Sequence, residues 1–423
     1  MAHFRGTIAP QMNLPNLRDV ESDLARILRE DGALAAVSVD MGALARIERS
    51  FGEAAYIALM DQIHPLLDEL RHRLRSDDIL AREDRGTDRL LLFVTRRRSG
   101  TVFKFGDLRN VAERLDSFLA GRIARLALPY LRERAAVSVG YGFVVYSPLE
   151  SPERQVARVL EECRASALLR RAVQEREMRE WLLEILHNRE VWTAFQPIVE
   201  METRRVMGYE GLSRGPRGSE LEPPVQLFGL AGRNGLVEEL ERACRKQAFI
   251  DWAGTGLSGR LFINTVPATV RDPSFLGRGV LDYLGALSPR MVTLEINERQ
   301  VIENLNLYRE AMHSFLDLGF TFAIDDVGAG YSGLETMATL GASYLKVDMG
   351  LVRHCHQKRV NRQVIRAILE MGKGGGATVI AEGIESADEA SALLEIGIRY
   401  GQGYHYGRPL DPRLIRPPTV AEG

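Results

Sequence analysis

The stretch FAIDDVGAGYSGLET, residues 322–336, places a short apolar run directly before two adjacent aspartates and a glycine-rich turn. An apolar run of this length that ends at a turn is typical of a buried β-strand. Two like charges at the end of such a run are costly unless a cation compensates them. The stretch therefore predicts a buried strand that ends at Asp325 and Asp326, with a cation beside them.

Similar runs recur on both sides of this stretch, and most of them end in an acid, an amide or a lysine. They are RRVMGYEGL (204–212), GRLFINT (259–265), RMVTLEINE (290–298), ASYLKVD (342–348), ATVIAEG (377–383) and IRYGQGY (398–404). Helical patterns separate them, and strands that alternate with helices predict βα units in a mostly parallel sheet. Seven or eight such units over about 230 residues match a TIM-like (β/α)8 barrel, in which the active site lies at the strand ends.

The polar residues at these strand ends form the candidate site. They are Glu210, Asn264, Glu295, Asp325, Asp326, Lys346, Glu382 and Gln402. Five carboxylates gathered at one barrel mouth would repel one another and raise their pKa values. The ligand candidates are all oxygen donors, which favours Mg²⁺ or Mn²⁺ over zinc. Two such ions about 3.5–4 Å apart can activate a water and clamp a phosphate.

Each of these residues also has an ordinary interpretation. Paired aspartates before a glycine turn are commonly a solvated turn, and a single strand-end glutamate is commonly a helix cap or a surface acid. Lys346 taken alone would be a surface lysine or would form a salt bridge with Asp348. The recurrence of polar residues at successive strand ends favours a metal-dependent site over these alternatives.

The N-terminal half has a different pattern. Apolar runs of strand length lie at 33–40 and 89–94, and a run rich in β-branched and aromatic residues lies at 135–146. Helical patterns between them predict an α+β or α/β domain. We expect this domain over residues 1–170, a helical connector over 171–190, and the barrel over 191–423. The connector could transmit rotation or dimer geometry, or it could be a plain amphipathic spacer.

Composition excludes several classes of protein. The 423 residues are 45% hydrophobic and 26% charged, with a net charge of −2, so the chain has no broad basic field for nucleic acid. No apolar run approaches the roughly 20 residues that span a bilayer, and the first residues lack the apolar core of a secretory signal. Cys163, Cys244 and Cys355 are scattered, which is typical of reduced thiols and predicts a cytoplasmic protein.

The C-terminal half resembles the EAL domain, the cyclic di-GMP phosphodiesterase module of bacteria. The resemblance begins with AFQPIVEMETRRVMGYEGLSR and continues through LFINTVP, LEINE, DDVGAGYSGL, LKVD, AEGIE and GQGYHYGRPL. It covers residues 190–412 in the family's order. The resemblance implies a TIM-like barrel that uses Mg²⁺ or Mn²⁺ to cut one phosphodiester of cyclic di-GMP, which gives linear pGpG. It also implies a homodimer.

The resemblance assigns roles to the candidate residues. First-metal ligands are Glu210, Asn264, Glu295 and Asp325, and Asp326 beside them is the second-metal ligand. Lys346 and Glu382 match residues that orient or deprotonate the attacking water, and Glu210 is counted with them as catalytic. Gln402 matches a residue that holds water at the site.

Further positions are assigned to substrate contact and to loop geometry. Arg214 resembles the arginine that contacts a substrate phosphate, and Gln196 and Leu212 lie near the ligand in the family. Gln402 belongs to this substrate-binding set as well. Glu298 resembles the glutamate that anchors the loop after the paired aspartates.

Several positions depart from the family pattern. Gly211 replaces the alanine of the namesake triplet, which removes a methyl group beside the first ligand. In the loop after the aspartates, Val327, Ala329 and Gly333 replace phenylalanine, threonine and serine. The stretch LAGRNG (230–235) lacks an acid that is usual there. Because no metal ligand is lost, we expect these changes to lower the rate or alter regulation.

The N-terminal half resembles a GGDEF domain, through LPNLRDVESDLARIL (14–28) and VSVDMGALARIERSFG (37–52). Asp40 matches a metal-binding aspartate, but Gly42 replaces the second acid and Glu48 the asparagine that reads guanine. The signature itself reads DRGTDRL (84–90), where an arginine replaces a glycine and hinders close approach of a triphosphate. We expect no cyclase activity. A structural or dimerising role is expected, with a regulatory GTP site as the alternative.

Three functions remain open from the sequence. The first is cyclic di-GMP hydrolysis, which the complete acid set favours. The second is a non-catalytic cyclic di-GMP receptor that signals to a protein partner. The third is an unrelated metal-dependent phosphoesterase built on the same barrel.

Overall fold

The computed structural model describes most of the chain, in two compact units, Met1–Arg179 and Glu180–Gly423. The described residues are 14–75, 77–84, 88–94, 105–127, 130, 137–265, 272, 277–285, 287–297, 312–328 and 341–415. Glu298, Ala329, Gly333 and the signature residues 85–87 lie outside them.

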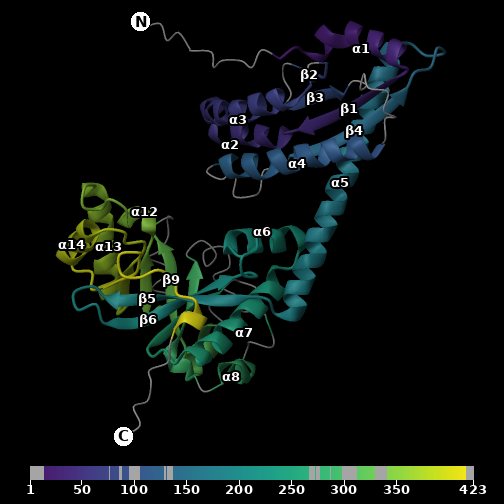
Figure 1. The fold of residues 1–423 in the computed structure, drawn as a ribbon. Coiled ribbons are helices and arrows are strands. Elements are labelled where there is room, and N and C mark those ends of the chain that lie inside the picture. The colour runs from purple at the N-terminus through teal and green to yellow at the C-terminus, as the bar shows by residue number, and fades with distance from the viewer. Residues whose placement is uncertain are drawn as a thin grey trace, which may run out of the picture. The chain divides into compact units, whose positions relative to one another are not determined.

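The first unit contains a four-stranded antiparallel sheet in the order β2-β3-β1-β4 (Figure 1). The strands are β1 (Ala33–Asp40), β2 (Ile79–Arg82), β3 (Arg89–Val94) and β4 (Ser138–Val145). Three of them fall in the runs expected from the sequence. The four-residue β2 was not predicted, because so short a segment has no measurable period.

Helices cover both faces of this sheet, and the alternation of side chains along β1 shows why. Ala35, Val37 and Val39 point to one face, where they pack with α2 (Ala45–Phe51), α3 (Glu53–Arg73) and α4 (Phe105–Ala127). Leu34 and Ala36 point to the other face, where they pack with α1 (Leu17–Asp31) and the start of α5 (Pro152–Asn188). A strand buried on both faces is apolar throughout, which explains the continuous run ALAAVSV.

The second unit is a closed eight-stranded barrel in the order β10-β11-β12-β5-β6-β7-β8-β9, which confirms the TIM-like fold. The strands are β5 (Trp192–Glu200), β6 (Val206–Arg214), β7 (Arg260–Thr265), β8 (Val292–Asn297), β9 (Thr321–Val327), β10 (Tyr344–Val347), β11 (Thr378–Ala381) and β12 (Tyr400–Gly401). β5 runs antiparallel to both β6 and β12, whereas the other neighbours are parallel. A hairpin thus replaces one βα unit.

The barrel is filled, not hollow. Ile198, Phe262, Ala323 and Ile380 form one buried apolar cluster, and they come from β5, β7, β9 and β11. Four side chains from alternate strands form one layer of a TIM-type core. Polar side chains nearer the carboxyl ends of the strands therefore lie over an apolar floor.

Helices pack around the barrel and complete two larger cores. They are α6 (Pro224–Asn234), α7 (Val237–Thr255), α8 (Leu281–Leu284), α12 (Met349–Val352), α13 (Arg359–Gly375) and α14 (Ala387–Ile396). One core includes Phe249 and Trp252 of α7, and the other includes Ile365 and Ile368 of α13. Together they fix the strands whose ends carry the candidate residues.

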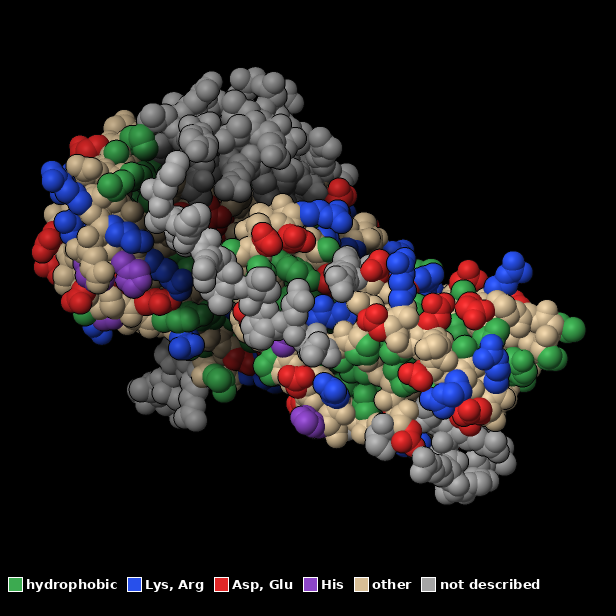
Figure 2. Space-filling model, turned by 90° about the horizontal axis from the view of Figure 1, so that it is seen from above, with side chains coloured by type: hydrophobic (Ala, Val, Ile, Leu, Met, Phe, Trp, Pro, Cys, Tyr) green, Lys and Arg blue, Asp and Glu red, His purple; other side chains and the backbone are tan. Residues whose placement is uncertain are grey.

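The charged side chains do not form a field of one sign on the face drawn in Figure 2. Lys and Arg side chains lie between Asp and Glu side chains over that surface, in agreement with the net charge of −2. Among the helices of the described ranges, none has the length and apolar character that a membrane span needs.

At two glycines of the barrel unit, an added methyl group should change the free energy of unfolding by very different amounts. At Gly403, whose φ is +157°, a Cβ would lie 2.1 Å from the carbonyl oxygen of Ile384. At Gly211 the nearest atom to a Cβ is Thr193 Cγ2, at 3.3 Å, and a side chain can move. We expect Gly403→Ala to lower the free energy of unfolding by roughly 2 kcal/mol or more, and Gly211→Ala to change it by less than about 1 kcal/mol.

Thermal and urea unfolding of the two variants beside the parent chain measures this difference. Equal destabilisation by both alanines would show that the backbone contact at Gly403 is not a constraint.

Candidate active site

Lys346 lies at the centre of the strand-end residues. It is on β10, it is fully buried, and its Nζ is close to four carboxylates. The distances from Nζ are 2.6 Å to Glu382 Oε1, 2.7 Å to Glu295 Oε1, 3.3 Å to Asp325 Oδ1 and 3.4 Å to Glu210 Oε2. One ammonium group thus faces four acids, so the cluster is short of positive charge.

These ion pairs leave much of the polar surface unsatisfied. Within the described residues, the buried Glu295 Oε2 has no hydrogen bond, and the buried Asp325 Oδ1 and Glu295 Oε1 have the Lys346 ammonium as an ion-pair partner but no further hydrogen bond. Buried polar atoms are nearly always hydrogen-bonded, and exceptions are often places where an ion or water binds. The acids are therefore arranged for a partner that the protein itself does not supply.

Neutral amides hold Glu210 in place from two sides. Asn264 Nδ2 on β7 donates to its Oε1 at 3.1 Å, and Gln402 Nε2 donates to its Oε2 at 2.6 Å. Gln402 Nε2 also lies 3.0 Å from Gln196 Oε1, and Gln196 Nε2 donates to the carbonyl of Gly407 at 3.0 Å. These contacts join β5, β6, β7 and the end of β12 in one network.

The paired aspartates occupy a bulge in β9. Adjacent residues on a regular strand point to opposite faces, so Asp325 and Asp326 could not both reach one site without an irregularity. Along the β9–β10 ladder, Ile324 pairs with Leu345, and Val327 pairs with Val347. The two residues Asp325 and Asp326 of β9 therefore lie opposite the single residue Lys346 of β10. Asp326 has φ of +58°, in the left-handed region. A bulge of this kind redirects a side chain, and bulges are common beside active sites.

This bulge brings a third carboxylate within reach. Oxygen atoms of Asp325, Asp326 and Glu382 lie within 4.8 Å of one another. Asn297 Nδ2, at the end of β8, donates to Asp326 Oδ2 at 2.6 Å and holds that carboxylate.

The cluster perturbs the ionisation of its members in opposite directions. Burial raises the pKa of Glu295 well above its ordinary value, and burial and Asp325 do the same for Glu382. Burial, together with Asp325 and Asp348, raises the pKa of Asp326 to about 6.

Two members stay charged despite their burial. Burial would lower the pKa of Lys346, but the charges of Asp325, Glu210 and its other acidic neighbours hold it well above its usual range. Burial would raise the pKa of Glu210, but Lys346, Gln402 and Asn264 hold it below its usual range. Lys346 is therefore a cation and Glu210 an anion.

The donor set fits hard divalent cations. Carboxylate oxygens and the amide oxygen of Asn264 are the ligands that Mg²⁺ and Mn²⁺ prefer. The unsatisfied Oε2 of Glu295 and the grouping of Asp325, Asp326 and Glu382 are the observations that support this fit. In the part of the chain that the structure describes, no histidine or cysteine belongs to this cluster.

The residues expected to contact substrate lie at the same mouth. Leu212 and Arg214 follow Glu210 at alternate positions on β6, so they leave the strand on its side. Arg214 Nη1 donates to the carbonyl of Ser213 at 2.9 Å, and burial lowers its pKa while Glu222, Tyr404 and Glu210 partly oppose that shift. Glu298, the expected loop anchor, lies outside the described residues.

Sequence reasoning missed two residues that act on Asp326. Asn297 binds it directly, and the charge of Asp348 raises its pKa. Both lie at strand ends inside motifs that were recognised, LEINE and LKVD. The position at a strand end was the signal that could have identified them.

Comparison with known proteins identifies the family of the barrel unit. Residues 179–409, more than half of the chain, match the model of the family described as the EAL domain. The chain is 30% identical over 243 residues to the probable cyclic di-GMP phosphodiesterase PdeB of Escherichia coli, with 54% of this chain and 44% of that protein covered. It is 29% identical over 251 residues to the cyclic di-GMP phosphodiesterase NbdA of Pseudomonas aeruginosa, with 57% and 32% covered.

A solved structure agrees on the fold. The Xanthomonas citri FimX EAL domain in complex with c-diGMP is similar at a TM-score of 0.51 and 20% identity, with 56% of this chain and 94% of that one covered. Identity this low supports the fold alone. The chain spans less than half the length of these two curated relatives.

The charge balance around Lys346 can be tested by removing its cation. Lys346→Met leaves two buried and two largely buried carboxylates without an internal counter-charge, so we expect the free energy of unfolding to fall by about 3–5 kcal/mol. Mn²⁺ should raise the unfolding midpoint of this variant more than that of the parent chain. The measurement is thermal unfolding with and without Mn²⁺.

Lys373→Met is the matched control, since Lys373 is an exposed lysine that pairs with Glu370 at 2.8 Å. If the two methionine variants are equally stable and respond equally to Mn²⁺, Lys346 does not balance the acids.

Proposed function

The chain belongs to the EAL domain family, and we propose that it hydrolyses cyclic di-GMP to linear pGpG with two divalent ions at the barrel mouth. The observation that carries this proposal is the set of four largely buried acids around Lys346, in which Glu295 Oε1 pairs with the lysine and Glu295 Oε2 has no hydrogen bond within the described residues. A protein that only bound the nucleotide would not need so many uncompensated carboxylates, which are costly to bury.

Each ligand has a stated place in this proposal. Glu210, Asn264, Glu295 and Asp325 would hold the first ion, and Asp326 together with Asp325 would hold the second. Bound Mg²⁺ or Mn²⁺ would supply Lewis-acid activation of a water and neutralisation of the phosphodiester charge. Asn264 already binds Glu210 and Asn297 already binds Asp326, so these carboxylates are oriented before any ion arrives.

In this proposal, residues of the protein accept the proton of the attacking water and hold that water in position. Glu382 is a largely buried carboxyl whose pKa is raised by burial and by Asp325, and a raised pKa makes its carboxylate a stronger general base. Lys346 lies 2.6 Å from Glu382 Oε1 and can hold the attacking water beside that carboxyl. Gln402 donates to Glu210 and occupies the same mouth, where it limits the water's positions. Arg214 supplies a cation for a substrate phosphate.

A turnover experiment tests the proposal. Purified full-length protein with cyclic di-GMP and Mn²⁺ should form pGpG, detected by nucleotide chromatography, and Glu210→Gln should lower kcat by roughly 10³-fold because it removes a ligand charge. Glu200→Gln is the matched control, since Glu200 is a buried barrel glutamate that pairs with Arg399 and Thr203. Tight binding of cyclic di-GMP without pGpG would contradict the proposal and would favour a receptor.

We propose further that the first unit is a degenerate GGDEF domain with a structural or dimerising role. Asp40, which resembles a metal ligand, is already paired: its Oδ2 lies 2.7 Å from Arg89 Nε, and its Oδ1 accepts from Gly42 N at 2.8 Å. Arg89 Nη1 also donates to Glu83 Oε2 at 3.0 Å. An arginine thus supplies the positive charge that a metal-dependent cyclase would take from an ion.

This second proposal predicts an inactive cyclase. GTP with Mg²⁺ or Mn²⁺ should yield no cyclic di-GMP, because both carboxylate oxygens of Asp40 already accept hydrogen bonds, from Arg89 and from Gly42. The assay is chromatography of the nucleotides after incubation with a Glu210→Gln variant, in which any product would accumulate. Formation of cyclic di-GMP would contradict the proposal, and a change of phosphodiesterase rate on adding GTP would support the alternative of a regulatory GTP site.

A further inference from the structure

The loop that follows Arg214 is closed by its own hydrogen bonds. Gly215 N donates to the carbonyl of Glu222 at 3.1 Å, which joins the two ends of the loop. Gly218 N donates to Glu222 Oε2 at 2.8 Å, and Ser219 Oγ donates to the carbonyl of Pro216 at 2.6 Å. The segment 215–222 is therefore braced by its own hydrogen bonds, and its first residue is bonded covalently to Arg214.

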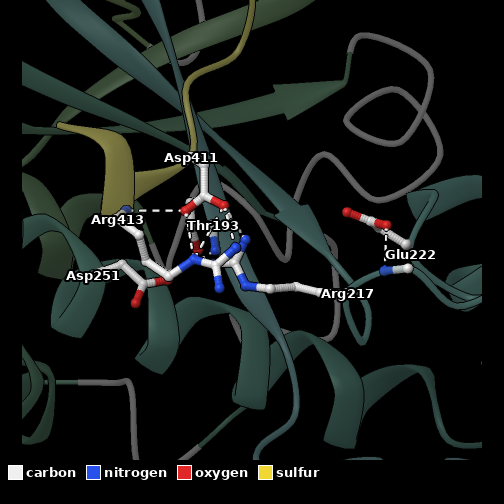
Figure 3. A network of polar contacts seen from close by, with 7 residues as sticks. Thr193, Arg217, Glu222, Asp251, Asp411 and Arg413 are labelled. Atoms are coloured by element: carbon white, nitrogen blue, oxygen red, sulfur yellow. Dashed lines mark hydrogen bonds and ion pairs between the residues drawn. The ribbon is translucent and has the colours of Figure 1, made fainter.

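One side chain of this loop ties it to the rest of the barrel. Arg217 forms an ion pair with Asp411, and its guanidinium lies 3.8 Å from the centre of the Trp192 ring. In Figure 3 the Asp411 carboxylate lies between Arg217 and Arg413, and Glu222 lies apart on the loop. The Asp411 side chain is 15% exposed and Arg217 is 30% exposed, so this pair is better shielded than an ordinary surface pair.

Both partners of Arg217 are fixed to β5. Trp192 is the first residue of β5, and its Cα partner across the β5–β6 ladder is Arg214 itself. Leu410, which precedes Asp411, exchanges two hydrogen bonds with Phe195 of β5, at 2.9 and 2.8 Å. Arg217 therefore folds the loop back over the strand that pairs with the end of β6.

Within the described residues, Arg214 has few contacts that orient it. Its guanidinium donates to the carbonyl of the adjacent Ser213, a contact that moves with the loop. The acidic groups whose charges act on it are those of Glu210 and Glu222. Of these, Glu222 belongs to the loop that Arg217 holds.

From these contacts we propose that Arg217 is a positioning residue, which through Asp411 and Trp192 fixes the loop after β6 so that Arg214 faces a substrate phosphate. The proposal rests on the proposed phosphodiesterase function for the identity of the substrate. The anchoring itself does not depend on that function. Asp411 is 194 residues from Arg217 in the chain, so this contact also fastens the C-terminal segment to the site.

The first test measures the anchor without substrate. Amide hydrogen exchange over residues 215–222, followed by mass spectrometry, should accelerate in Arg217→Ala by at least tenfold. Arg217→Lys should give an intermediate rate, because a lysine keeps the charge but not the planar stacking on Trp192. Arg413→Ala is the matched control, since Arg413 binds the same carboxylate at 2.8 Å but lies outside the loop. Unchanged exchange in Arg217→Ala overturns the proposal, whatever the activity of that variant.

The second test asks whether the anchor acts through Arg214. With cyclic di-GMP and Mn²⁺, Arg217→Ala should raise KM roughly tenfold and change kcat by less than about twofold. Arg214→Ala should raise KM at least as much, and the double variant should be no worse than Arg214→Ala alone. Arg413→Ala should leave both constants near those of the parent chain.

The outcomes separate the two proposals. Additive losses in the double variant, or a fall in kcat at constant KM, overturn the positioning role. Absence of pGpG from the parent chain contradicts the proposed function instead, and hydrogen exchange then decides whether Arg217 anchors the loop.

Discussion

The structure of the barrel mouth depends on the balance of charge around one buried lysine. Lys346 is fully buried and faces Glu210, Glu295, Asp325 and Glu382 within 3.4 Å. Without that ammonium, four carboxylates could not share so small a volume over an apolar layer. One ammonium group does not balance four carboxylates. Burial and the neighbouring acids accordingly raise the pKa values of Glu295 and Glu382. Divalent ions would complete the balance and bring with them the chemistry of phosphodiester hydrolysis.

The backbone makes this cluster possible through two departures from a regular barrel. The bulge at Asp325 and Asp326 places two consecutive carboxylates opposite Lys346, which a regular strand cannot do. The reversed strand β5 lies beside β6 and β12, so that Gln196 and Gln402 meet next to Glu210. The close grouping of charged residues at the barrel mouth thus depends on the bulge in β9 and the reversed direction of β5, as well as on the residue types present.

Much of this arrangement could be predicted from the sequence, since most strands are short apolar runs and most functional residues lie at or near their carboxyl ends. Glu210 and Gln196 are exceptions, because they lie within β6 and β5. The antiparallel course of β5 could not, because WTAFQPIVE is buried along most of its length and has no alternation that reveals its direction. The positive φ of Asp326 has no local signature either, as aspartate is not glycine. The role of Arg217 could not be predicted because its partner, Asp411, is 194 residues away in the chain. The pattern of a single sequence contains no information on such distant pairings. Residues 85–87 and Glu298 lie outside the described ranges, so those expectations stay predictions.

Anomalous scattering from a crystal grown with Mn²⁺ and cyclic di-GMP tests the central claim most directly. We expect two manganese peaks about 3.5–4 Å apart, beside the carboxylates of Asp325, Glu295 and Asp326. A nucleotide seated at the mouth of the barrel with no manganese among these carboxylates would contradict it.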